Sequence, residues 1–127
     1  MKSSLKIDLG LLILRLSGSG FLMAAHGIPK LMKYFGQEPI QFGDPIGIGP
    51  GPSHFLAMFA EVFCALLVLI GFKSRWAALP VIFTMLVAAF IAHAADPLGV
   101  KEKPLLFAAI FISILLMGPG RFSVDKK

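Results

Sequence analysis

The chain has 127 residues and a formal net charge of +5, and 57% of its residues are hydrophobic. A soluble domain is about 45–50% apolar, so this composition favours a membrane protein. The basic residues lie mainly at the ends of apolar runs, which suits anionic lipid head groups and argues against a nucleic-acid-binding protein. Cys64 is the single cysteine, which excludes an internal disulfide and a CxxC redox pair.

The first apolar run predicts a membrane-spanning helix over residues 9–32. Lys2 and Lys6 precede this run, as basic residues precede the apolar part of a signal peptide. The run is longer than the apolar part of a signal peptide, however, and Arg15 interrupts it. We therefore expect a retained first span.

Three further apolar runs predict spans over residues 53–71, 76–95 and 104–118. About 20 apolar residues cross a bilayer as a helix, so the short last run either gains turns from its flanks or only dips into the membrane. Small residues recur along the runs, as is typical of closely packed membrane helices. The predicted fold class is all-α, with residues 1–127 forming one transmembrane antiparallel four-helix bundle.

The connections between the predicted spans differ in character. Residues 73–75 predict a tight turn, which makes the second and third spans antiparallel neighbours. Residues 36–52 are rich in glycine and proline, which oppose regular structure. A long loop of this kind either covers a site or is a flexible linker. The loop carries enough apolar residues to lie on the bundle, which favours a cover over a site. These residues are Ile40, Phe42, Ile46 and Ile48.

The distribution of basic residues predicts that both termini lie in the cytoplasm. Cytoplasmic segments of membrane proteins carry an excess of Lys and Arg. With the N-terminus inside, the inner segments hold seven basic residues and the outer segments four. The inner ones are Lys2, Lys6, Lys73, Arg75, Arg121, Lys126 and Lys127, and the outer ones are Lys30, Lys33, Lys101 and Lys103.

Ionisable residues interrupt the first three apolar runs: Arg15, Glu61 and His93. A charge near the bilayer centre costs about 2.5–3.5 kcal/mol or more, so such residues face a protein interior and usually serve a function. The rise of about 1.5 Å per residue places Arg15 and Glu61 at similar depths. We hypothesise an ion pair between them, with a purely structural role as the alternative.

Further polar residues are expected nearer the outer face. His26 is expected on the same helix face as Arg15, because it follows Arg15 by eleven residues. His93, in the third span, is expected at a membrane depth similar to that of His26. Together with Arg15 and Glu61, they could line one outer-facing polar pocket that relays protons, hydrogen-bonds a quinone carbonyl or binds a metal. The alternative is that each histidine is satisfied at the interface. Secondary candidates for the pocket are His54, Asp96 and Glu102.

No metal site is predicted, because no single helix carries an HxxxH or HxxE spacing. Metal ligands would have to be assembled from separate helices. Lys30 and Lys33 are expected to extend to the membrane interface. Cys64 is expected to be a packing residue.

The sequence resembles the DoxX family of small four-helix membrane proteins over nearly its whole length. The resemblance lies in five stretches, in order: LRLSGSGFLMAAHGIPKL, the Ala60-Glu61 pair, IGFKSRWAAL, MLVAAFIAH and the closing GPGRFSVD. It implies a multi-pass protein of the bacterial inner membrane and a subunit of a membrane oxidoreductase system. The positions carried over are Arg15, His26, Glu61 and His93, whereas His54 and Cys64 are outside the pattern.

Three functions remain open at this point. The first is a redox-system subunit, not necessarily active alone, that contacts quinone or a thiol/sulfur oxidoreductase partner through the outer pocket. The second is a non-catalytic membrane scaffold or assembly factor. The third is a small transporter, which would need a homo-oligomer because four short helices leave little room for a cavity in one chain. The expected partners are therefore the lipid bilayer, a redox enzyme and further copies of the chain.

Overall fold

The computed structural model describes residues 3–36, 39 and 42–126. All regular structure in these ranges is helical. Ile40, which was part of the predicted cover, lies outside the described residues, as do Lys2 and Lys127 of the charge count.

The first helical rod consists of α1, Ser3–Leu22, and α2, Ile28–Met32, joined by the π-helical segment η1, Met23–Gly27. A short 3-10 turn, Lys33–Phe35, ends this rod. The rod begins about six residues before the predicted span, because the polar residues that precede the apolar run are also helical.

The second and third rods follow the same plan. The second contains α3, Pro50–Phe59, the π-helical segment η3, Ala60–Cys64, and α4, Ala65–Ile70. The third contains α5, Ser74–Val87, and the π-helical segment η4, Ala88–Ala92. Within the described residues, three continuous helices are long and apolar enough to cross a membrane: Ser4–Phe35, Pro50–Ile70 and Ser74–Ala92.

The last rod is α6, Leu98–Met117. It begins after Pro97 rather than at Pro104, where the sequence predicted its start, and Pro104 lies inside the helix. The extra turns contain Lys101, Glu102 and Lys103. Every span-length stretch of α6 contains all three of these charges, and α6 is not among the three membrane-capable helices.

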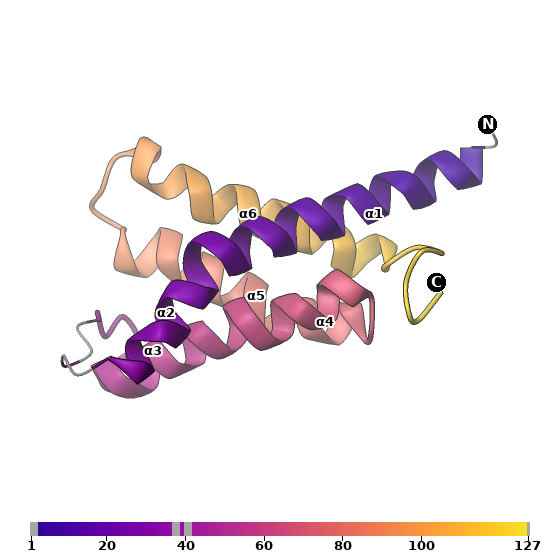
Figure 1. The fold of residues 1–127 in the computed structure, drawn as a ribbon. Coiled ribbons are helices and arrows are strands. Elements are labelled where there is room, and N and C mark those ends of the chain that lie inside the picture. The colour runs from indigo at the N-terminus through magenta and orange to yellow at the C-terminus, as the bar shows by residue number, and fades with distance from the viewer. Residues whose placement is uncertain (1–2, 37–38, 40–41, 127) are drawn as a thin grey trace.

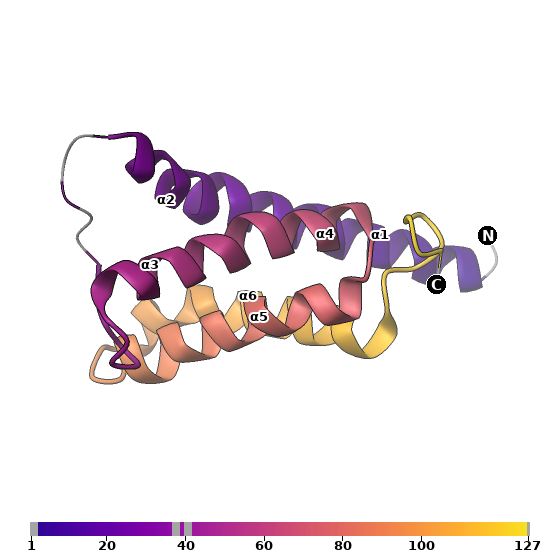
Figure 2. The same ribbon diagram turned by 90° about the horizontal axis from the view of Figure 1, so that it is seen from below.

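Both termini lie at one end of the molecule, which we call the terminal end (Figures 1 and 2). The turn between α4 and α5 is also at this end. The segment between α2 and α3 and the turn between η4 and α6 lie at the opposite end, which we call the loop end (Figures 1 and 2).

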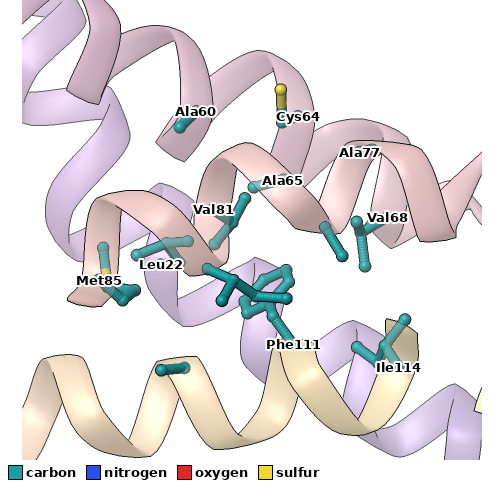
Figure 3. Packing of buried hydrophobic residues seen from close by; sticks show 13 residues of the cluster. Leu22, Ala60, Cys64, Ala65, Val68, Ala77, Val81, Met85, Phe111 and Ile114 are labelled. Atoms are coloured by element: carbon teal, nitrogen blue, oxygen red, sulfur yellow. The ribbon is translucent and has the colours of Figure 1, made fainter. Parts of the chain in front are cut away.

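Small residues let the rods approach one another closely around an apolar core (Figure 3). At Gly18 of α1, an added Cβ would lie 2.7 Å from Cγ2 of Ile110 in α6. Large apolar side chains such as Trp76, Phe21 and Phe83 are exposed on the outer surface. This distribution suits lipid as the surrounding solvent. The core residues are Leu22, Ala60, Cys64, Ala65, Val68, Ala77, Ala78, Val81, Ile82, Met85, Ala108, Phe111 and Ile114.

Candidate functional site

A cavity of about 720 Å³ lies within the single chain, toward the loop end. Its size is typical of small-molecule sites. Four short helices were expected to leave little room for a cavity, and this expectation is wrong. The cavity forms because side chains from every rod and from the Gly/Pro-rich loop contribute to its wall. The loop residues that line it are Phe42, Gly43, Pro45 and Ile46, consistent with the predicted cover.

The most buried charged side chains in the cavity wall form the Lys30–Glu61 ion pair. Nζ of Lys30 donates to Oε1 of Glu61 at 2.9 Å, and their side chains are 19% and 3% exposed. The predicted Arg15–Glu61 pair is therefore wrong. Lys30, which was expected at the membrane interface, instead extends toward the second rod and supplies the cation that the buried carboxylate requires.

Arg15 lies toward the terminal end and does not line the cavity. Its guanidinium is buried, and all of its hydrogen-bond acceptors in the described part of the chain are backbone carbonyls. Nε reaches the oxygen of Val68 at 3.1 Å, and Nη2 reaches that of Leu69 at 2.7 Å. Nη1 reaches the oxygens of Pro119 and Phe122 at 3.1 and 2.8 Å. Arg15 therefore joins three segments of the chain, and the structure separates it from the other pocket candidates.

His26 and His93 both line the cavity, as does Glu61. The His26 ring meets the ring of Phe107 edge-on, with 5.8 Å between the centroids. His93 ends the third rod, and its Nδ1 lies 2.7 Å from Oδ2 of Asp96. Asp96 is half-exposed on the adjoining turn and is in contact with this site through His93.

His54 and Glu102 do not join this cavity. His54 is fully buried, its Nδ1 lies 2.9 Å from the hydroxyl of Tyr34, and Phe42 covers its ring at a centroid distance of 5.1 Å. Helix periodicity places His54 two turns before Glu61 on the same helix face, but it does not reveal these aromatic neighbours. Glu102 is exposed and lines a separate groove on the outer side of α6.

Each π-helical segment contributes to the cavity wall. η1 supplies His26, η3 supplies Glu61, and η4 supplies Ala88 and Ala92. π-helical turns are rare and often occur at functional sites. Sequence periodicity could not reveal them, because a continuous apolar run has the same pattern whether a turn is α-helical or contains one extra residue.

The sequence reasoning also missed Lys30 and Lys103 as cavity residues. Lys30 follows His26 by four residues and therefore shares its helix face, a signal that could have identified it. Among the described residues, no cluster of three or more His, Cys, Asp or Glu side chains could hold a metal ion. The polar side-chain groups available to a ligand are amines, imidazoles, two hydroxyls and one carboxylate.

Comparison with known proteins agrees with the membrane character of the helices. The DoxX family model matches residues 10–94. Inner membrane protein YqjF of Escherichia coli K12 is 29% identical over 123 residues, which cover 94% of this chain and 92% of that protein. Inner membrane protein YphA of the same organism is 30% identical over 112 residues, covering 80% of this chain and 78% of that protein. No solved structure matches the chain.

The relatives and the three membrane-capable helices confirm the predicted localisation, a multi-pass protein of the inner membrane. The family model covers more than half of the 127 residues and includes Arg15, His26, Glu61 and His93. The chain therefore belongs to the DoxX family.

Proposed function

We propose that this protein is a membrane subunit of a redox system that holds the ring of a quinone in the cavity at the loop end. The observation that supports this function best is the composition of the cavity wall. It is mostly apolar, with a few polar side chains: His26, Lys30, Ser53, Glu61, Thr84, His93 and Lys103.

The chemistry of a quinone fits such a wall. Its ring and isoprenoid tail need an apolar surface, and each carbonyl oxygen accepts a hydrogen bond. The ammonium groups of Lys30 and Lys103 are donors, and the imidazoles of His26 and His93 can donate from one ring nitrogen. A quinone with an isoprenoid tail also dissolves in the bilayer, from which a cavity in a membrane protein can take it up.

The arrangement in the membrane is part of the proposal. All four rods cross the bilayer as an antiparallel bundle, with the terminal end in the cytoplasm and the cavity toward the outer side. The excess of basic residues at the terminal end supports this orientation. The redox partner, a quinone-linked or thiol/sulfur enzyme, would then exchange electrons with the bound quinone.

The function is tested by mass spectrometry of the protein extracted gently from its native membrane. We expect quinone to copurify with the wild type. Ala88→Phe, which places a ring in the cavity wall, should reduce the quinone content to background. Ala95→Phe is the matched control, because Ala95 is exposed on the turn and does not line the cavity.

The same preparations distinguish the alternatives. If quinone is absent from the wild type, or if both variants retain it equally, the quinone site is wrong. Partner chains that copurify with all three proteins, without quinone, would instead indicate a scaffold or assembly factor.

A further inference from the structure

We infer that the cavity distinguishes the two redox forms of its ligand and binds the hydroquinone more tightly than the quinone, with Glu61 as the specificity-determining residue. The inference rests on the proposed quinone-binding function and adds the identity of the preferred redox form. The feature that carries it is an incompletely paired, buried carboxylate in the cavity wall.

Glu61 is the single carboxylate among the described residues that line the cavity. Its side chain is 3% exposed, and Oε1 accepts a hydrogen bond from Lys30. Its second oxygen, Oε2, accepts no hydrogen bond from the described part of the chain. An ionised carboxylate has about four lone-pair sites, so Glu61 retains acceptor capacity that a ligand can use.

The position of Glu61 is constrained from two directions. Lys30 holds its carboxylate from the first rod. Gly27, one turn before Lys30, packs directly on the Glu61 backbone, since a Cβ there would lie 2.7 Å from the carbonyl carbon. The carboxylate is therefore held in place before a ligand arrives, which reduces the ordering cost of binding.

The two redox forms of a quinone differ in their hydrogen-bonding groups. A hydroquinone hydroxyl donates an O–H, whereas a quinone carbonyl only accepts. Against Glu61, the hydroxyl makes a charge-assisted hydrogen bond. The carbonyl instead directs its lone pairs at an anion in a setting of low dielectric constant, which is unfavourable.

The other polar groups of the wall do not discriminate in this way. Lys30 and Lys103 donate to a hydroxyl oxygen as well as to a carbonyl oxygen. The imidazoles of His26 and His93 and the hydroxyls of Ser53 and Thr84 can donate or accept. Selectivity for the reduced form therefore rests on Glu61, the one group of this set that can only accept when it is ionised.

The test compares binding of a decyl-substituted benzoquinone and its hydroquinone to purified full-length protein without oxygen. Because only the hydroquinone makes a charge-assisted hydrogen bond to Glu61, we expect it to bind at least about 10-fold more tightly. Such a preference raises the midpoint potential of the bound couple by about 30 mV. A redox titration of the bound ligand provides this second readout.

A change in the ligand tests the inference without altering the protein. The dimethyl ether of the same hydroquinone keeps the ring and both oxygens but has no O–H to donate. We expect its affinity to fall to that of the quinone or below. An ether that binds as tightly as the hydroquinone would overturn the role of the O–H.

A change in the protein assigns the effect to the carboxylate. Glu61→Gln keeps the shape and one acceptor but removes the charge, and it should bring the two affinities close together, mainly by weakening the hydroquinone. Glu102→Gln is the matched control on the outer side of α6 and should leave the ratio unchanged.

The outcomes separate this inference from the function on which it rests. If neither redox form binds to the wild type, the proposed quinone site fails. If both forms bind with equal affinity, or if folded Glu61→Gln retains the wild-type ratio, the quinone site stands and the selectivity is wrong.

Discussion

Arg15 is a structural residue of the terminal end. The last carbonyls of a helix have no partner within the helix, and at the end of α4 one guanidinium donates hydrogen bonds to two of them. The planar fork of Arg spreads five N–H donors over three nitrogens, whereas an ammonium group offers its three donors from a single atom. Its other two acceptors, Pro119 and Phe122, lie in the segment after α6.

Replacing Arg15 by Lys should therefore destabilise the protein although the charge is kept. Hydrogen bonds from charged donors are worth about 1.5–3 kcal/mol each, so losing two of the four should cost about 3 kcal/mol or more. Thermal unfolding in detergent measures this loss. Arg121→Lys is the control, because Arg121 is 59% exposed and lies 3.7 Å from Asp8, a surface pair worth about 0–1 kcal/mol. Equal melting of the two variants would contradict the role of Arg15.

Gly27 should be intolerant of any side chain, because η1 and η3 meet there without a gap. A Cβ at Gly27 would lie 2.9 Å from Cγ2 of Val62 and would also strike the Glu61 backbone. Overpacking of this kind costs about 1–3 kcal/mol, so Gly27→Ala should lower the melting temperature and weaken ligand binding. Gly20→Ala, in the same rod with nothing within 4 Å, should be neutral or slightly stabilising. A Gly27→Ala protein as stable as the Gly20→Ala protein would refute the close contact.

Among the elements, the C-terminal segment is held by the end of α4. The backbone N–H of Val124 donates to the oxygen of Ile70 at 3.1 Å, and that of Asp125 to Gly71 at 2.9 Å. The C-terminal segment therefore packs on the turn between α4 and α5. Arg75, in the first turn of α5, donates to the oxygen of Leu115 in α6.

Gly71 makes this docking possible and should be the most sensitive position of the turn. It ends α4 with φ of 77°, and its N–H donates to Leu67 and Val68. Any Cβ at Gly71 would collide with Ser123 and would occupy a left-handed conformation that costs about 1–2 kcal/mol. Gly71→Ala should therefore release the C-terminal segment, which limited proteolysis detects as faster cleavage near residue 123. Gly10→Ala, with no neighbour within 4 Å, should be cleaved at the wild-type rate.

At the scale of the whole molecule, the two ends should lie on opposite sides of the membrane. Cysteines introduced one at a time test this in intact cells, with a thiol reagent that cannot cross the bilayer. Gly99→Cys at the loop end should be labelled, whereas Lys73→Cys at the terminal end should be labelled only after the cells are opened. Both positions are exposed, and native Cys64 is 4% exposed and should react little. Labelling of Lys73→Cys in intact cells would reverse the orientation.

The sequence predicted part of the candidate site. His26, Glu61 and His93 were expected near one another because each interrupts or flanks an apolar run, and the structure lines one cavity with all three. Arg15 and Lys30 were misassigned because helix rise gives a residue's depth and not its direction around the rod. The π-helical segments change that direction, and periodicity does not reveal them.

The sequence by itself determined the class of the protein: an all-helical membrane protein of the DoxX family. Apolar runs and turn residues are local properties, and the bilayer requires every exposed backbone group to be satisfied within a helix. The tertiary structure decided which cation pairs with Glu61 and which carbonyls accept hydrogen bonds from Arg15. Those contacts join residues that are 31 and up to 107 positions apart, and they depend on how the rods rotate and pack.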